Sequence, residues 1–298
     1  MKKIIKRTLI LLLLLIILLL GAFGYLLFNI DKNVEDKVFS NRDVINILIV
    51  GKESSLTLEN IDENSPVHTD TIMILKVDNK SRRAKIISIP RDTYFEYLPG
   101  SKKRHQKINA AYFLGGIENT KEVIEDFLDI KIDNYVEVDY KFVADVINAL
   151  GGMEINWEYD DYYYEDNWTS PPLVIDLHRG INQLSGEEAV NYLRARNAYA
   201  DADLGRIKAQ QEFVVSLFKK IKEPANLLIV PKLVSLFNKE AESDIEFEDC
   251  IYLGYYAFKY LNSEKISLVT LQGEDLRIDG IEYYKINKTD AREIYLEN

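Results

Sequence analysis

Apolar and polar positions along the chain follow two periods, which together predict strands alternating with helices. Short runs rich in β-branched residues indicate buried strands. The strands expected in this way lie at residues 46–50, 70–77, 84–89, 135–138, 153–156, 173–177 and 266–271. Apolar positions spaced three and four apart predict helices at residues 140–150, 203–221 and 249–260, and Thr120 is expected to cap a further helix ending at Leu128. This alternation predicts an α/β domain with a central mixed sheet.

Two of these strands lie on either side of a polar turn at residues 78–83, an arrangement typical of a β-hairpin. If the turn is centred near residues 80–81, the numbers of facing residues sum to about 161. Asp70 then faces Arg91 at the open end of the hairpin. The register alone therefore predicts a contact between these two charged residues.

The first 30 residues differ from the rest of the chain. Residues 8–30 are apolar and uncharged, and four basic residues precede them: Lys2, Lys3, Lys6 and Arg7. A run of this length can cross a bilayer about 30 Å thick, and the basic cluster predicts a cytoplasmic N-terminus. A cleaved signal peptide is the alternative, but the run is long and no A-x-A-like site follows it. We expect a basic tip and one transmembrane helix over residues 1–30, a stalk over residues 31–44, and an outer domain over residues 45–298.

Charge and cysteine content narrow the class of protein. The 298 residues carry a net charge of −11, and leaving out the four basic residues ahead of the apolar run gives −15 for the outer part. An excess of negative charge disfavours nonspecific binding of nucleic acid. Cys250 is the only cysteine, so the chain cannot form an intramolecular disulfide.

Three arginines lie close together at residues 193–211, where one predicted helix ends and another begins. The sequence SGEE at residues 185–188 has the spacing of a capping box and predicts a helix from about Gly186. That helix carries Arg194 and Arg196 out of its last turn, and a second helix is expected to begin near Asp203, a good N-cap residue. Arg206 and Gln210 are four apart and share one face of the second helix.

Arginines around a helix N-terminus are typical of an anion-binding site, because guanidinium groups and free N–H groups both bind phosphate oxygens. A charged loop with surface ion pairs is the alternative. Glu53, Asp70 and Asp92 lie near the ends of predicted strands, and carboxylate oxygens suit a hard cation such as Mg²⁺. Carboxylates, a divalent cation and several arginines around one pocket are suited to phosphoryl transfer.

The segment at residues 157–172 is rich in Tyr, Asp and Trp and ends in two prolines. This composition favours a flap. Its aromatic side chains would either stack on sugars or cover an edge of the core, and the composition does not separate these two roles.

Five motifs stand in the order seen in LytR-CpsA-Psr proteins. They are TDT at 69–71, IPRDT at 89–93, KINAAY at 107–112, LGG at 150–152 and the arginine stretch ending at Gln211. The chain resembles that family over about residues 45–298, and the single predicted anchor also fits.

The resemblance implies an α/β/α sandwich with an apolar channel for a lipid tail, on the outer side of the cell membrane of a Gram-positive-type bacterium. The family attaches anionic polymers, such as wall teichoic acid or capsular polysaccharide, to peptidoglycan. The donor is a polyprenyl-pyrophosphate-linked glycan, and Mg²⁺ assists, with Mn²⁺ as an alternative cation. We therefore expect a glycopolymer–peptidoglycan phosphotransferase. A pyrophosphatase acting on the same lipid, and a membrane-anchored regulator that binds an anionic lipid without turnover, are the alternatives.

The resemblance also assigns roles to residues. Asp70 and Glu53 match the metal ligands. The residues that match pyrophosphate binders are Arg91, Arg194, Arg196, Arg206, Gln210 and His68. The catalytic set is Arg91, Asp92, Asp203 and Arg206, in which Asp203 orients arginines and either Asp92 or Asp203 acts on the attacking hydroxyl. The chain departs from the family at two positions, because Glu53 stands where Asp is usual and His68 where Arg is common.

Overall fold

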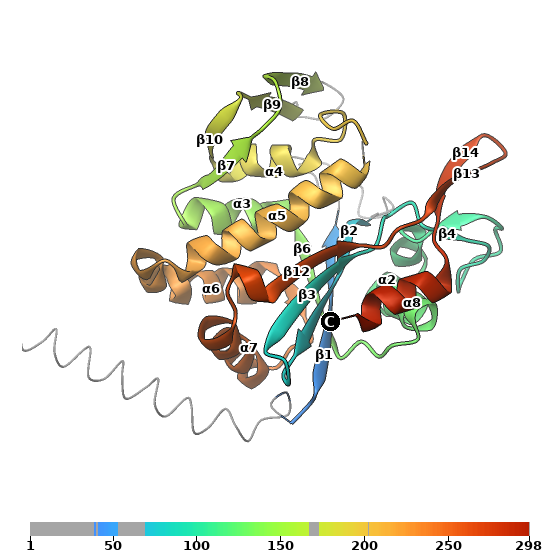
Figure 1. Ribbon diagram of the computed structural model, residues 1–298, viewed down its shortest axis with the longest axis horizontal. Coiled ribbons are helices and arrows are strands. Elements are labelled where there is room, and N and C mark those ends of the chain that lie inside the picture. The colour runs from blue at the N-terminus through green and yellow to red at the C-terminus, as the bar shows by residue number, and fades with distance from the viewer. Residues whose placement is uncertain (1–38, 40, 53–68, 167–172, 202, 298) are drawn as a thin grey trace, which may run out of the picture.

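The computed structural model describes residues 39, 41–52, 69–166, 173–201 and 203–297 (Figure 1). Its centre is a six-stranded sheet with the strand order β11-β6-β1-β2-β3-β12. The strands are β11 (Glu242–Ser243), β6 (Asn134–Asp139), β1 (Val44–Lys52), β2 (Thr69–Asp78), β3 (Arg83–Ser88) and β12 (Ile266–Thr270). β1 pairs with β6 and β3 pairs with β12 in parallel, whereas the other three pairings are antiparallel. The expected α/β domain with a mixed sheet is confirmed.

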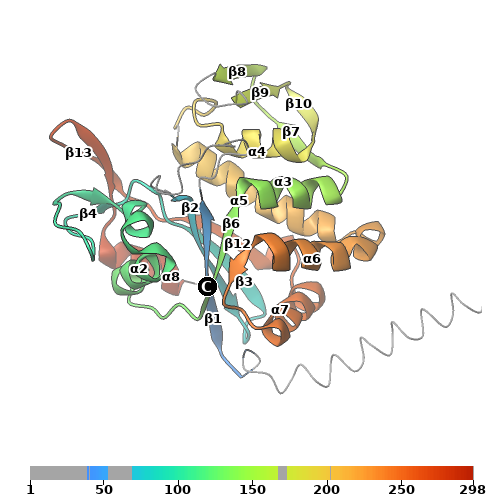
Figure 2. The same cartoon turned by 180° about the vertical axis from the view of Figure 1, so that it is seen from behind.

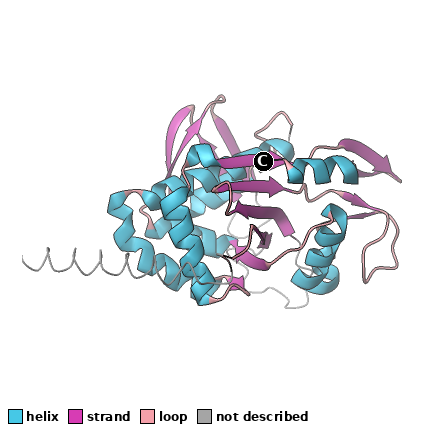
Figure 3. Cartoon of the chain, turned by 60° about the horizontal axis from the view of Figure 1, so that its bottom comes forward, coloured by secondary structure: helices cyan, strands magenta, loops and turns pink. Residues whose placement is uncertain are grey.

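Helices cover both faces of this sheet (Figures 2 and 3). On one face, Leu48 and Val50 of β1 belong to a buried cluster shared with α2 (Ala110–Leu128) and α8 (Lys288–Leu296). On the other face, Ile45 and Ile47 pack in a cluster with α7 (Phe247–Tyr260). Because side chains alternate along a strand, a strand buried on both faces is apolar at nearly every position. This explains the unbroken apolar run that first indicated β1.

The hairpin register is also as predicted. Met73 pairs with Ser88, and Val77 pairs with Ala84, so the numbers of each pair sum to 161. The same register carried beyond the ladder brings Asp70 opposite Arg91, and the two side chains form an ion pair.

A second layer of structure lies over one end of the sheet. It contains α3 (Tyr140–Ala149), α4 (Gly186–Arg194) and two small antiparallel pairs. The pairs are β7 (Met153–Trp157) with β10 (Gly180–Leu184), and β8 (Tyr162–Asp166) with β9 (Leu173–Leu177). Together with α5 (Asp203–Lys222) they enclose a core around Trp157, whose side chain is buried.

The aromatic segment is therefore more ordered than a flap over its described residues. Trp157 is a core residue and donates its indole N–H to the Asp160 carbonyl at 2.8 Å. Residues 162–166 form β8 rather than an irregular loop, because pairing with β9 satisfies their backbone polar groups. For Trp157 the structure supports covering of the core, whereas Tyr162 and Tyr164 line a pocket described below.

The helix at residues 110–128 starts earlier than expected. The helix that Thr120 is expected to cap begins before that residue, because α2 spans residues 110–128 and its backbone is non-helical only at Gly115 and Gly116. Thr120 lies inside the helix and its hydroxyl donates to the Gly116 carbonyl at 3.0 Å.

The remaining elements are β4 (Tyr94–Phe95), β5 (Gln106–Lys107), η1 (Pro224–Ile229), α6 (Val230–Glu240), η2 (Ser263–Lys265), β13 (Glu274–Ile278) and β14 (Ile281–Lys285).

The capping box at the start of α4 is present. The Ser185 hydroxyl accepts from the Glu188 amide at 3.3 Å, and the Glu188 carboxylate accepts from the Ser185 amide at 2.8 Å. Ser185→Ala should lower the free energy of unfolding by about 1 kcal/mol, since it removes the side-chain half of this cap. Denaturant titration beside Ser263→Ala, an exposed serine of η2, checks this, and equal stability of the two variants would contradict it.

No helix in the described part of the chain is long and apolar enough to cross a membrane. The predicted transmembrane helix at residues 1–30 and most of the predicted stalk lie outside the described residues. The described residues just ahead of β1 contact the domain directly. Phe39 is buried in the cluster beneath α7, and Arg42 forms an ion pair with Asp133.

Candidate active site

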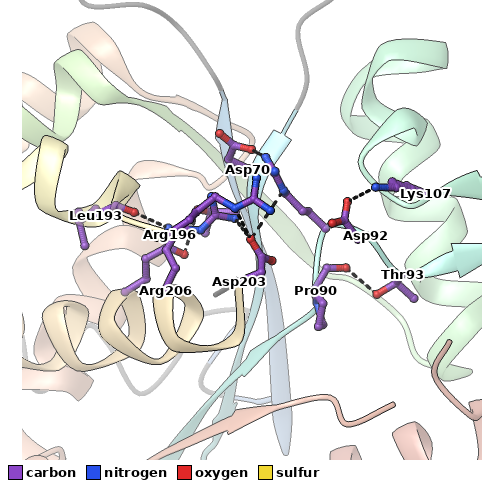
Figure 4. A network of polar contacts seen from close by, with 12 residues as sticks. Asp70, Pro90, Asp92, Thr93, Lys107, Leu193, Arg196, Asp203 and Arg206 are labelled. Atoms are coloured by element: carbon purple, nitrogen blue, oxygen red, sulfur yellow. Dashed lines mark hydrogen bonds and ion pairs between the residues drawn. The ribbon is translucent and has the colours of Figure 1, made fainter. Parts of the chain in front are cut away.

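The arginines and aspartates of the predicted site meet where the hairpin opens (Figure 4). Asp70 stands at the start of β2, and Arg91 follows Pro90 just beyond β3. Asp203 and Arg206 occupy the first turn of α5, and Arg196 comes from the connection between α4 and α5. Asp203 is the first residue of that helix, within one position of the predicted start. Three segments far apart in sequence therefore meet in one place.

The Asp203 carboxylate lies among three guanidinium groups. One of its oxygens, Oδ1, is 2.6 Å from Arg206 Nη2, 3.3 Å from Arg196 Nε and 3.9 Å from Arg91 Nε. A single carboxylate near three cations partly offsets their mutual repulsion and limits the positions that each can occupy. The predicted orienting role of Asp203 is consistent with these distances.

Asp70 is held by a second set of contacts. Its carboxylate forms an ion pair with Arg91 and accepts a hydrogen bond from the Tyr140 hydroxyl at 3.1 Å. Burial opposes the charged form of Asp70, but the charges of Arg91 and Arg206, with the two hydrogen bonds, outweigh it and hold the pKa of Asp70 below its ordinary value. Asp70 is therefore a carboxylate at neutral pH.

Arg206 is the most deeply buried of these cations, with a side chain only 4% exposed. Its Nε atom, like that of Arg91, is buried without a hydrogen-bond partner, whereas its Nη2 atom lies 2.6 Å from the Asp203 carboxylate. Burial, together with the nearby Arg91 and Arg196, lowers the pKa of Arg206 despite the opposing effect of Asp203. Buried guanidinium donors without acceptors indicate that an anionic ligand belongs beside them.

These charges surround a pocket of about 330 Å³. Its polar wall contains Asp70 and the four predicted arginines: Arg91, Arg194, Arg196 and Arg206. Its opposite, largely apolar wall comes from the β8–β9 pair through Tyr162, Tyr164, Leu173 and Ile175. Asp203 is not part of the lining but pairs with three of these arginines, so the four guanidinium groups and the two carboxylates together carry two positive charges in excess. A pocket with these two walls is suited to a diphosphate bearing an apolar or sugar substituent.

Two glutamines join the elements behind the pocket. Gln210 accepts a hydrogen bond from the Thr71 hydroxyl at 3.3 Å and donates to the Leu193 carbonyl at 3.1 Å. Gln211 is buried and donates to the Ser88 hydroxyl at 2.8 Å. Gln210, predicted to bind pyrophosphate, is not among the residues that line the pocket, and its contacts instead tie α5 to β2 and to the end of α4.

The other predicted site residues are not part of the arginine–aspartate cluster at the pocket. Asp92 forms an ion pair with Lys107 at 2.9 Å and does not line the pocket (Figure 4). Glu53 and His68 lie outside the described residues. Within the described part of the chain, no group of three or more His, Cys, Asp or Glu residues is placed to hold a metal ion.

Sequence reasoning missed the residues that complete the pocket. Tyr140 donates to Asp70, and its ring lies 5.2 Å from the guanidinium carbon of Arg194. Tyr162, Tyr164 and the two aliphatic residues of β9 form the apolar wall. The alternation of buried and exposed residues along β9 indicated a strand, but no local signal indicated that one face of it lies opposite the arginines.

The depressed pKa of Asp70 makes stability depend on pH in a defined direction. A carboxylate whose pKa is lower in the folded than in the unfolded chain, where it is about 3.9, stabilises the fold fully above that unfolded value. This contribution is lost as the pH falls through the folded pKa. We expect Asp70→Asn to lower the free energy of unfolding by about 2 kcal/mol at pH 7, with the difference from the parent shrinking below about pH 4.

Denaturant titrations from pH 3 to pH 7 measure this difference. The matched control is Asp126→Asn, since the Asp126 side chain is 84% exposed. A difference between Asp70→Asn and the parent that grows on acidification would contradict the assignment.

Comparison with known proteins agrees with this architecture. TagV of Bacillus subtilis, named polyisoprenyl-teichoic acid–peptidoglycan teichoic acid transferase, is 27% identical over 98% of this chain and 78% of its own length. TagU of Bacillus licheniformis, which bears the same transferase name, is 26% identical over 99% of this chain and 95% of its own. Biofilm regulatory protein A of Streptococcus mutans is 28% identical over 91% of this chain and 70% of its own.

Solved structures also share this architecture. The crystal structure of B. subtilis TagV superposes with a TM-score of 0.69 at 28% identity, over 85% of this chain and 95% of that one. A crystal structure of a Streptococcus agalactiae protein superposes with a TM-score of 0.73 at 25% identity, over 85% of both chains. The LytR_cpsA_psr family model matches residues 28–297. With this match over most of its length, and with three of the five motifs contributing residues to one cationic pocket, the chain belongs to the LytR-CpsA-Psr family.

Proposed function

We propose that this protein transfers a teichoic-acid-type glycopolymer from a polyprenyl-pyrophosphate carrier to peptidoglycan. The observation that carries the proposal is the pocket in which Arg91, Arg196 and Arg206 converge on Asp203 while the buried Nε donors of Arg91 and Arg206 have no hydrogen-bond acceptor. Membership of the family and the names of the TagV and TagU relatives support the same reaction. A diphosphate supplies the acceptors that these donors lack.

In this proposal Arg91, Arg206 and the two arginines at the end of α4 bind the diphosphate oxygens. Asp203 keeps three of the four guanidinium groups converged, so that little reorganisation is needed when charge builds on the phosphate. A sugar hydroxyl of peptidoglycan attacks the phosphorus nearest the glycan. The bond from that phosphorus to the bridging oxygen breaks, and polyprenyl phosphate leaves.

The residues at the pocket fit a divalent cation in part. Asp70 is a buried carboxylate with a depressed pKa, and Mg²⁺ usually takes one or two carboxylates and completes its shell with phosphate and water. Asp70, with Glu53 as the second expected ligand, would hold Mg²⁺ or Mn²⁺. The cation would neutralise phosphate charge alongside the arginines. Arg91 now pairs with Asp70 and would turn toward the diphosphate when a cation takes that carboxylate.

Asp92 is paired with Lys107, whereas Asp203 lies among three of the arginines that line the pocket, so we assign to Asp203 the role of orienting the attacking hydroxyl and accepting its proton. The proposal also includes one transmembrane helix at residues 1–30, a cytoplasmic N-terminus and an outer domain on a Gram-positive-type cell. The apolar channel for the prenyl chain stays a prediction. The pocket of about 330 Å³ is suited to the diphosphate and the groups next to it.

One experiment separates the candidate functions. The full-length protein in detergent would be incubated with a polyprenyl-pyrophosphate glycan, peptidoglycan oligomers and Mg²⁺, and the products separated by chromatography with mass detection. Glycan phosphate joined to the oligomer, with polyprenyl phosphate released, supports transfer. Release of polyprenyl phosphate with free glycan phosphate supports the pyrophosphatase. Bound but unchanged lipid supports the regulator, a class suggested by the name of the S. mutans relative.

A further inference from the structure

The outward face of α7 carries an apolar stripe. Phe247, Ile251 and Phe258 are 62%, 37% and 51% exposed. Their spacings of four and seven place them on one face of the helix. The opposite face is buried against the sheet through Tyr252 and Tyr256. Three large apolar side chains in a row on a solvent-facing helix typically mark a binding surface.

This stripe lies at the end of the domain where the chain enters. The Asn79 side chain donates to the Phe39 carbonyl at 2.8 Å and to the Arg42 carbonyl at 2.6 Å, and it accepts from the Tyr252 hydroxyl at 2.9 Å. The first described residue, the β2–β3 turn and α7 are thus joined. The apolar run at residues 8–30 ends nine residues before Phe39. A fully extended connection of that length spans only about 30 Å.

Three basic residues lie at the same end of the domain as the stripe. Lys80, Arg82 and Arg83, all exposed, lie in the β2–β3 turn. That turn is fixed to α7, because the Tyr256 hydroxyl donates to the Asp78 carbonyl at 2.7 Å and the Arg82 guanidinium carbon lies 4.3 Å from the Tyr260 ring centroid. The acidic residues of α7, Glu248 and Asp249, are in its first turn beside Phe247, whereas the basic turn contacts the last turns of the helix at Tyr256 and Tyr260. Lys80 forms an ion pair with Asp43 at 2.5 Å. In a chain of net charge −11, three cations in one turn, one of them paired in this way, favour an anionic surface beside the apolar stripe.

We propose that the outward face of α7 and the β2–β3 turn dock on the outer surface of the cell membrane. Phe247, Ile251 and Phe258 enter the boundary between head groups and acyl chains, and the three basic residues of the turn contact lipid phosphates. The proposal rests on the anchored topology proposed above, because the anchor brings this end of the domain to the bilayer.

Docking in this way sets the distance between the diphosphate pocket and the lipid surface. α7 and the start of α4 lie at opposite ends of the domain in two views (Figures 1 and 2). β1 runs from the membrane end to the site, and its nine residues span roughly 30 Å at about 3.3 Å per residue. The diphosphate pocket then stands roughly 30 Å from the lipid surface, facing the wall. The donor must extend its prenyl chain along the domain to reach the pocket.

Depth-dependent fluorescence quenching tests the docking. The full-length protein, with Cys250→Ala and a single reporter cysteine, would be reconstituted into vesicles of phosphatidylglycerol and phosphatidylethanolamine containing a doxyl-labelled lipid. The reporter is Phe258→Cys, and the matched control is Tyr163→Cys, a position 63% exposed on β8 in the second layer. We expect at least fivefold stronger quenching at position 258 than at position 163. Adding Ile251→Asp should reduce the quenching at position 258 at least threefold.

Equal quenching at the two positions, or quenching at position 258 that Ile251→Asp leaves unchanged, would overturn the proposal. The proposal would also be overturned if the reporter at position 258 were shielded from solvent in detergent without lipid and the protein had the mass of a dimer. A second copy of the chain would then cover the stripe. The assay uses neither donor nor acceptor, so a protein that docks without transferring glycan still shows the quenching. Extraction of the protein from vesicles by alkaline carbonate would show that the anchored topology itself is wrong.

Discussion

Replacing Arg206 by alanine should lower the rate of glycopolymer transfer by about three orders of magnitude. Removing one preorganised donor from a charge-stabilising site typically costs a factor of 10² to 10³, and arginines that contact a transferring phosphoryl group supply 10³ or more. Arg206 combines the deepest burial with an unpaired Nε donor, so its charge acts with the least screening by water. Initial rates of polyprenyl phosphate release, measured with acceptor in excess, give the ratio.

Two further variants make this result interpretable. Arg206→Lys keeps the charge but loses the planar fork, and should recover only part of the lost rate. Arg104→Ala removes a 60% exposed arginine that pairs with Glu96 outside the pocket, and should leave the rate unchanged. A loss of less than tenfold in Arg206→Ala, in a protein whose thermal midpoint matches the parent, would remove Arg206 from the proposed machinery.

Replacing Asp203 by asparagine should cost about 3 kcal/mol of stability and most of the activity. The change removes the carboxylate next to which Arg91, Arg196 and Arg206 converge, and leaves three guanidinium groups facing a neutral amide. Breaking a partly buried ion-pair network in this way is among the larger effects of a single substitution. Denaturant titration measures the loss, and the transfer assay follows the activity.

The effect of inorganic pyrophosphate on the stability of each variant tests this prediction further. Inorganic pyrophosphate at 100 times its dissociation constant stabilises a protein that binds it by about 2.7 kcal/mol. Asp203→Asn should gain more from pyrophosphate than the parent does, because the anion replaces the missing negative charge. Asp201→Asn, two positions earlier in an exposed turn, is the matched control. Equal gains in parent and Asp203→Asn would argue that the arginines do not converge on the anion site.

Local patterns determined much of the fold. The capping box at Ser185, the start of α5 near Asp203 and the hairpin register that pairs Val77 with Ala84 all depend on residues close in sequence. In each case hydrogen bonds and side-chain alternation within one or two elements decide the outcome, so the sequence contains the information. The pairing of Asp70 with Arg91 belongs here too, because it extends the hairpin register by only a few residues.

Other features depended on contacts that no local pattern encodes. Thr120 has the residue type of a cap, but the break in α2 falls at Gly115 and Gly116, so Thr120 lies inside the helical segment that follows. Trp157 occurs in a segment of loop-like composition, yet the second layer needs a large side chain at its centre. For Trp157 the free energy of burying apolar surface outweighs the local preference.

The sequence by itself determined which chemical groups the site contains, namely four arginines with aspartates to hold them, and the resemblance to one family. Only the tertiary structure decided how they are grouped. It directed Asp92 toward Lys107, placed Gln210 behind the pocket, and brought Tyr140 and the β8–β9 wall to the diphosphate side. The reason is physical. Residue type sets charge and hydrogen-bonding capacity, whereas the direction of each side chain depends on how layers distant in sequence pack around one core.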